Sequence, residues 1–200
     1  MNAASRQAGR AERDAGLPSR RRKVANFVLF QAAWFAAVLG AARQVPLWGT
    51  ACVVAVIGWH VAISARPAAE ARLVALACCI GFAFESAMAV QGLVRYPSGQ
   101  PAAALAPYWL VALWGLLAIS PNVTLRWLKG RPVLAAAIGA VAGPAAFASG
   151  ARLGAANFTD SARALVAIGV SWAVLLPALM WLSERYDGVV VPRPGKAPHG

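Results

Sequence analysis

The chain has little of what soluble enzymes and binding domains use for polar chemistry. Of its 200 residues, 13% are charged, seven are Asp or Glu and two are His. Its three cysteines lack the CxxC or Cys/His spacing of a metal or redox site, and the multi-histidine boxes of membrane di-iron enzymes are missing. A Walker loop, a GxSxG elbow and a soluble domain for nucleotide hydrolysis are missing as well. These absences predict no metal, no cofactor and no recognisable catalytic residues.

Long apolar runs make up most of what remains. Hydrophobic residues form 60% of the chain and its mean hydropathy is +0.59, with the apolar residues in uninterrupted runs rather than alternating patterns. The net charge of +12 would suggest a nucleic-acid partner in a soluble protein. Here, however, the basic residues stand at the ends of apolar runs and form no stripe with exposed aromatic residues. Lipid, and not nucleic acid, is therefore the predicted surrounding of most of the chain.

Six of the runs are long enough to cross a hydrocarbon core of about 30 Å at 1.5 Å per residue. The sequence thus predicts an all-α polytopic integral membrane protein, a six-helix bundle over residues 24–185 between disordered tails at 1–23 and 186–200. The first run also resembles a signal peptide, but its length and its polar Asn26 and Gln31 favour a retained helix. The predicted spans are residues 24–42, 46–64, 73–94, 107–125, 132–151 and 164–182.

The basic residues predict the orientation of this bundle. If residues 1–23 are cytoplasmic, fifteen of the nineteen Lys and Arg fall on the cytoplasmic side. The other side then carries only Arg43, Arg95, Arg152 and Arg163. Short cytoplasmic loops are enriched in Lys and Arg, so both termini are predicted to be cytoplasmic.

One stretch, Arg131 to Ala155, has the pattern of a central packing helix. Small residues recur there at three- or four-residue steps, which places them on one face of a helix. Small residues on such a face let a second helix backbone approach closely. The predicted packing residues are Gly139, Gly143, Ala146, Gly150 and Gly154.

Glu85 is the carboxylate that lies within a predicted span. A charged residue at the centre of a membrane helix costs about 2.5–3.5 kcal/mol on insertion scales, so such residues face the bundle interior. Arg152 lies near the far end of the fifth span, from which its side chain can reach inward. A Glu85–Arg152 ion pair would lower the cost of burying both charges. The structural alternatives are a stabilising ion pair or an Arg152 side chain that snorkels to the interface. The functional alternative places the pair at the base of an outward-facing cavity, with Trp114 and Trp172 as walls and Glu85 as a proton or cation site.

A second polar cluster is predicted nearer the cytoplasmic side. Gln31 and His60 each lie about 9–12 Å inside that boundary by helical rise. They are expected to hydrogen-bond each other, joined by Asn26 or Asn122. Interhelical contacts of this kind contribute about 0.6 kcal/mol on average and are common in packing. A catalytic or ligand-binding role for His60 is the less favoured alternative.

Four stretches together are similar to a known family: residues 26–35 (NFVLFQAAWF), 109–114, 127–132 (WLKGRP) and 139–154. They resemble the small bacterial inner-membrane family known as domain of unknown function 2878, over roughly residues 24–185. The resemblance implies a six-helix multi-pass protein of the bacterial inner (cytoplasmic) membrane. Because that family has no established activity, the resemblance implies no catalytic residues.

Three functions are compatible with these features. The favoured one is a non-catalytic accessory or assembly partner in the cell envelope, related to lipids, with membrane lipid, other membrane proteins or a second copy as partners. The alternative is a small-solute or proton-coupled transporter that uses Glu85 and needs a water-accessible cavity between the third, fifth and sixth spans. The third is an intramembrane lipid-modifying enzyme, which requires His60 and Glu85 to converge with a nucleophile. Their depths, about 10 Å or more apart, argue against that enzyme.

Overall fold

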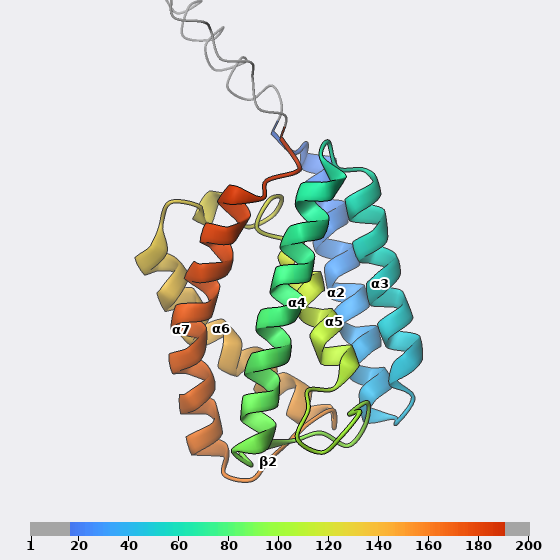
Figure 1. The fold of residues 1–200 in the computed structure, drawn as a ribbon, viewed down its shortest axis with the longest axis vertical. Helices are drawn as coiled ribbons and strands as arrows, with labels where there is room; N and C mark the ends of the chain where they lie inside the picture. The colour runs from blue at the N-terminus through green and yellow to red at the C-terminus, as the bar shows by residue number, and fades with distance from the viewer. Residues whose placement is uncertain (1–16, 191–200) are drawn as a thin grey trace, which may run out of the picture.

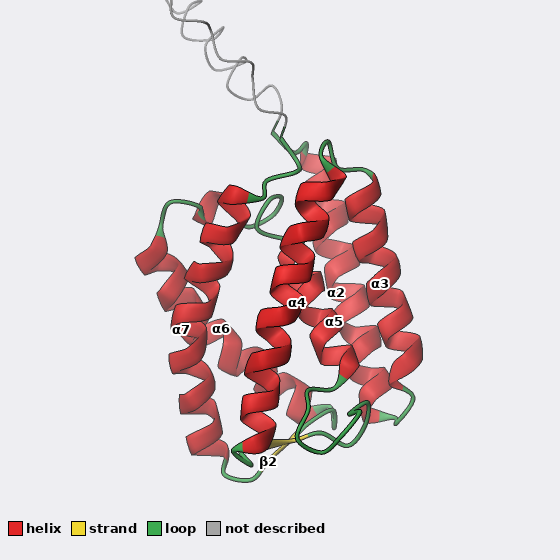
Figure 2. Cartoon of the chain, in the orientation of Figure 1, coloured by secondary structure: helices red, strands yellow, loops and turns green. Residues whose placement is uncertain are grey.

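The computed structural model describes residues 17–190, and this part of the chain is an all-α bundle (Figures 1 and 2). It contains six α-helices, a 3-10 turn and a two-stranded ribbon. The helices are α2 (Arg20–Ala42), α3 (Pro46–Ala62), α4 (Pro67–Val90), α5 (Tyr108–Ala118), α6 (Pro132–Arg152) and α7 (Ser161–Arg185). The turn η1 (Arg126–Leu128) lies between α5 and α6, and the strands are β1 (Val94–Arg95) and β2 (Asn157–Phe158).

The helix starts follow from local chemistry. Proline stands at the first position of α3, α4 and α6, where its missing N–H would have no partner within the helix and its fixed φ suits the first turn. Ser19 caps α2 by accepting a hydrogen bond from the backbone N–H of Arg22. This cap corrects the predicted boundary of the first tail, because the helix already begins at Arg20. Residues 1–16 of that tail and 191–200 of the other lie outside the described residues.

The fourth helix differs most from its prediction. The predicted span 107–125 is helical only as α5, Tyr108–Ala118, and residues 119–125 form turns. Pro121 explains the difference, because it has no backbone N–H to continue the helix and disfavours a helical residue before it. Asn26 on α2 holds the turn in place by donating to the carbonyl of Ile119 and accepting from Thr124.

Length and composition mark the chain as a membrane protein. The helices α2, α4, α6 and α7 are long and apolar enough to cross a membrane, while α3 and α5 are shorter apolar helices. Large apolar side chains are exposed around the bundle, including Trp48 at 77% and Val141 at 71%. A water-soluble surface would not leave so many of them uncovered, whereas lipid tails cover them at no cost.

The helices pack in pairs, α2 with α3, α4 with α5 and α6 with α7. The first two pairs join through α3 and α5, whereas the α6–α7 pair stands at one side and makes few contacts with the others (Figure 1). The antiparallel β1–β2 ribbon links it to the end of α4 (Figure 2). We call this end of the bundle the ribbon end. The opposite end, where α2 begins and α7 finishes, is called the terminal end.

Candidate functional site: a cavity beside Glu85

Glu85 lies on the inward face of α4, which also carries Leu73, Ala77 and Gly81 at four-residue steps. Its side chain is fully buried, at 0% exposure. Both carboxylate oxygens accept a hydrogen bond, Oε2 from the hydroxyl of Tyr96 at 2.8 Å and Oε1 from Nε1 of Trp114 at 2.9 Å. Within residues 17–190 no cation pairs with it, so two neutral donors satisfy this buried acid.

Gly81 allows Trp114 to reach Glu85. A Cβ atom at residue 81 would lie 2.1 Å from Cγ of Trp114, so no larger residue leaves room for the indole. The indole also packs on Trp172 of α7, with 5.1 Å between ring centroids. Trp114 therefore connects α5 to both α4 and α7 at the level of Glu85.

Tyr96 comes from the segment that follows β1. Its ring packs edge-on against Trp109, with centroids 6.3 Å apart. Burial, and next the nearby Glu85 carboxylate, raise the pKa of Tyr96 far above its ordinary value. The phenol therefore stays protonated and remains a donor to Glu85.

A cavity of about 730 Å³ lies beside this group. Its wall is mostly apolar, and α2 and α6 form facing sides of it with residues such as Phe35 and Ala145, both of which are exposed. Since α2 and α6 hardly pack on each other, the cavity is open between them. The residues that line it on α2 are Phe30, Gln31, Trp34, Phe35 and Val38, and on α5 they are Trp109, Leu110, Leu113, Trp114 and Leu117.

Arg152 lines the same cavity but does not pair with Glu85, which corrects the predicted ion pair. The reason is that Tyr96 and Trp114 already engage both oxygens of Glu85. Arg152 is the last residue of α6, and its side chain is exposed. Within the described residues its guanidinium forms no ion pair with a carboxylate and no hydrogen bond to an acceptor.

Gln31 and His60 do not meet, which corrects the second predicted contact. Gln31 lines the cavity from α2. His60 lies near the terminal end of α3, fully buried, with Nε2 at 2.8 Å from Oε2 of Glu70. A carboxylate thus takes the place that was predicted for the amide of Gln31.

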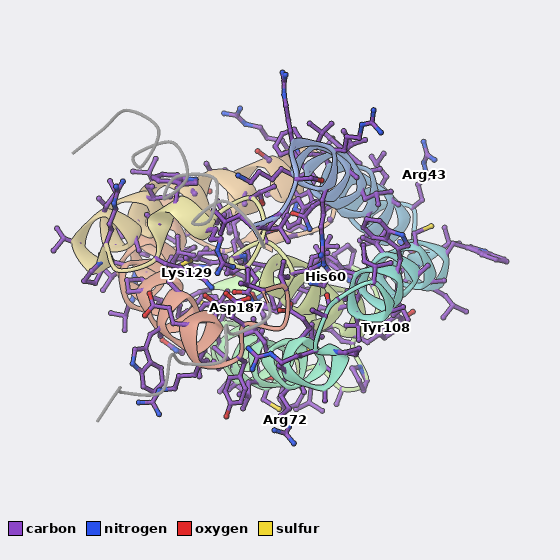
Figure 3. The ribbon with its side chains drawn as sticks, turned by 90° about the horizontal axis from the view of Figure 1, so that it is seen from above. Arg43, His60, Arg72, Tyr108, Lys129 and Asp187 are labelled. Carbon is purple, nitrogen blue, oxygen red and sulfur yellow. The ribbon has the colours of Figure 1, made fainter. Side chains whose placement is uncertain are left out.

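Glu70 is the centre of a second polar network, at the terminal end. Besides His60, its carboxylate accepts from Nδ2 of Asn122 at 2.7 Å and from the backbone N–H of Gly188 at 2.7 Å. In Figure 3, viewed from above, His60, Lys129 and Asp187 point inward between the helices, while Arg43 and Arg72 point outward. Lys129 donates to both Asn122 and Asp187, so the network extends from α3 to the segment after α7.

This network corrects the predicted second tail over residues 186–190. Gly188 packs so closely that a Cβ atom would lie 2.5 Å from the carbonyl oxygen of Arg66. The backbone N–H of Arg66 also donates to the carbonyl oxygen of Gly188 at 2.9 Å. Asp187 is held by Arg126 at 2.6 Å and by Lys129 at 2.9 Å. The ordered C-terminal segment is thus part of the bundle.

The predicted packing face of α6 divides into two parts. Added Cβ atoms at Gly139 and Gly143 would lie 2.2 and 2.4 Å from atoms of Trp172, so these glycines admit α7. Gly150 lines the cavity and has open space around it. Gly154 lies beyond the end of α6 at Arg152, where its φ of +91° closes the helix, so it does not belong to the packing face.

Sequence reasoning missed Glu70 and Tyr96. Glu70 lies three residues before the predicted third span and so outside the stretches in which polar residues were sought, although it shares the inward face of α4 with Glu85. That shared face was the signal that could have found it. Tyr96 lies in a loop, where periodicity gives no direction to a side chain. Within the described residues no group of three or more His, Cys, Asp or Glu is placed to hold a metal ion.

Comparisons with known proteins place the chain in a family. A search of curated proteins and a search of solved structures found no match. One family model does match, that of DUF2878, described as a protein of unknown function, over residues 23–178. This range includes α3 to α6 in full and the residues of the cavity from Phe30 to Trp172. Since the match covers most of the chain, the protein belongs to the DUF2878 family.

Proposed function

We propose that the protein is a non-catalytic membrane protein that binds one lipid molecule in the cavity between α2 and α6. The observation that carries this proposal is the cavity itself, which has the volume of a small-molecule site, about 300–1,000 Å³, and is open on an apolar flank of the bundle. A ligand that enters from that side comes from the lipid layer. Apolar walls with few polar groups suit an acyl chain.

The proposal includes the setting of the protein. The protein is a multi-pass accessory or assembly partner of the bacterial inner membrane, with six spans and both termini in the cytoplasm. The basic residues support this orientation, because Arg43, Arg95, Arg152 and Arg163 belong to the ribbon end and the other described Lys and Arg to the terminal end. Its partners are membrane lipid and, through its exposed apolar helices, other membrane proteins or a second copy.

Quenching of tryptophan fluorescence by lipids with brominated acyl chains tests lipid binding, because Trp34, Trp109, Trp114 and Trp172 line the cavity. The purified protein in detergent should show saturable quenching. Ala146→Phe, which fills the cavity from α6, should remove the saturable part. Ala137→Phe, on the same helix but exposed and outside the cavity, is the matched control. Quenching that rises linearly in all three proteins would refute the proposal.

A second candidate is proton-coupled transport of a small solute through Glu85. It is supported by the position of this carboxylate, which borders the cavity and has no cationic partner within residues 17–190. In vesicles with a pH-sensitive dye inside, a transporter would carry protons when solute is added, and Glu85→Gln would stop it. The enzyme hypothesis has no such support, because His60 is engaged by Glu70 and is not among the residues that line the cavity.

A further inference from the structure

We infer that the lipid in the cavity is an anionic glycerophospholipid, with its phosphate against Arg152 at the ribbon end and an acyl chain along α2 and α5. This inference rests on the proposed function and adds the head group and the direction of the bound lipid. It depends on the charges, the hydrogen-bond donors and their depths in the cavity.

The accessible charge in the cavity is positive. Glu85 and Arg152 are the charged residues among those that line it. Glu85 is 0% exposed and both of its oxygens accept hydrogen bonds, so a ligand does not reach its charge. Arg152 is exposed and has no ion pair within the described residues. A guanidinium binds phosphate through two parallel hydrogen bonds, which makes phosphate a well-suited group for this position.

The same charges favour an anionic head group over a zwitterionic one. A zwitterionic head would also bring an ammonium group, which Arg152 repels and which no accessible carboxylate in the cavity offsets. Glu85 is covered, and Asp160 at the ribbon end is already used to cap α7 by accepting from the backbone N–H of Arg163. The ribbon end further carries Arg43 and Arg95, so the local field favours a net negative head.

A second polar group lies deeper in the cavity. Nε1 of Trp172 is buried and has no hydrogen-bond partner within the described residues, although its indole lines the wall. A buried donor without a partner is unfavourable, and an oxygen from a ligand would offset that cost. Trp172 lies against Gly143, nine residues before Arg152 on α6, or about 13 Å away along the helix.

Arg152 and Nε1 of Trp172 lie at different depths in the cavity, and this separation distinguishes a phospholipid from a fatty acid. A glycerophospholipid has ester carbonyls below its phosphate, and the long side chain of Arg152 can bend toward the cavity to shorten the separation. The ester oxygens then lie near Trp172 and the chain continues along Leu113 and Leu117. A fatty acid has a single polar end and leaves one of the two groups without a partner.

The test compares brominated lipids with identical chains and different heads in the quenching assay described above. The wild-type protein should bind phosphatidylglycerol about tenfold more tightly than phosphatidylcholine, because both lipids offer the phosphate but the ammonium of phosphatidylcholine adds a repulsive charge near Arg152. Arg152→Gln should reduce this preference to about twofold or less and keep the extent of quenching. Arg163→Gln, a change of an exposed arginine at the same end but outside the cavity, should leave the preference intact.

The outcomes separate this inference from the proposed function. Saturable quenching that is equal for both phospholipids would overturn the head-group inference and leave lipid binding in place. A brominated fatty acid that binds as tightly as phosphatidylglycerol would overturn the choice of a glycerophospholipid. An equal loss of preference in Arg152→Gln and Arg163→Gln would show attraction to the whole basic end and would overturn the role of Arg152. Absence of saturable quenching with every lipid would refute the proposed function itself.

Discussion

Glu70 and Glu85 are two fully buried carboxylates on one face of α4, and their surroundings differ. Glu70, at the terminal end, contacts an imidazole, an amide and a backbone N–H from three other parts of the chain. Glu85, near the ribbon end, accepts from a phenol and an indole and borders a cavity. Burial of an acid therefore has two uses in this bundle. One carboxylate joins the chain segments together, and the other shapes the wall of an open site.

The largest expected effect comes from removing these carboxylates one at a time. Glu70→Ala should lower the free energy of unfolding in detergent by about 3–5 kcal/mol, because it leaves Nε2 of His60 and the Gly188 N–H without a partner in the interior and removes one of the two acceptors of the Asn122 amide. Glu85→Ala leaves two neutral donors unpaired and should cost about 1–3 kcal/mol. Equilibrium unfolding of both variants measures the difference.

Glu184→Ala is the control for these variants, since this carboxylate is exposed and contacts only the N–H of Gly130 among the described residues. This substitution should change the free energy of unfolding by no more than about 0.5 kcal/mol. The comparison between the two ends of α4 would be wrong if Glu85→Ala destabilised the protein as much as Glu70→Ala does.

A smaller effect should follow from disturbing the wall of the cavity. Gly143→Leu forces a side chain into Trp172 and should cost about 1–3 kcal/mol by overpacking. Ala137→Leu, on the exposed side of the same helix, should change the free energy of unfolding by no more than about 0.5 kcal/mol. Folded yield by size-exclusion chromatography and the midpoint of thermal unfolding provide the measurement.

Gly143→Leu should also remove saturable quenching by brominated lipid, because displacement of Trp172 or α6 changes the cavity that both help to form. This readout connects the packing of α6 on α7 with the proposed function. Equal yields and equal midpoints for Gly143→Leu and Ala137→Leu would contradict close packing at Gly143.

Much of the fold followed from the sequence, because apolar runs and their basic flanks are local signals. Pro46 and Pro132 mark helix starts that coincide with those of the predicted spans, whereas Pro67 starts α4 six residues before the predicted third span. The inward direction of Glu85 was also predictable from its small neighbours on the helix. Pro121 ended α5 early because its missing N–H outweighed the apolar composition of residues 119–125.

The partners of the buried acids were not predictable in the same way. Charge complementarity suggested Arg152 for Glu85, but the phenol of Tyr96 and the indole of Trp114 reach it through a loop and through the gap at Gly81. Likewise Glu70 meets Gly188, 118 residues later in the chain. Such contacts depend on tertiary packing, and the spacing of residues within one helix does not predict which distant segments will meet.

Replacement of Asp187, at the terminal end, should change the free energy of unfolding less than the other substitutions do, controls excepted. Burial acts to raise the pKa of Asp187, but Lys129 and next Arg126 outweigh it and hold the pKa below its ordinary value. An acid whose folded pKa is lowered stabilises the fold above its unfolded pKa of about 3.9, and that contribution is lost as the pH falls through the folded value. The difference in unfolding free energy between wild type and Asp187→Asn should therefore be constant from about pH 6 to 8, near 1 kcal/mol for a partly exposed pair.

Below about pH 4 that difference should shrink toward zero, because the wild-type carboxylate becomes neutral as well. Thermal unfolding of both proteins over a pH series measures it, and Asp160→Asn, at the ribbon end, is the control for general acid effects. If the Asp187 difference stayed constant down to about pH 3, the ion pairs with Lys129 and Arg126 would not be what holds the C-terminal segment. The backbone contacts of Gly188 would then carry that role, namely its N–H bond to Glu70 and the bond that its carbonyl oxygen accepts from the N–H of Arg66.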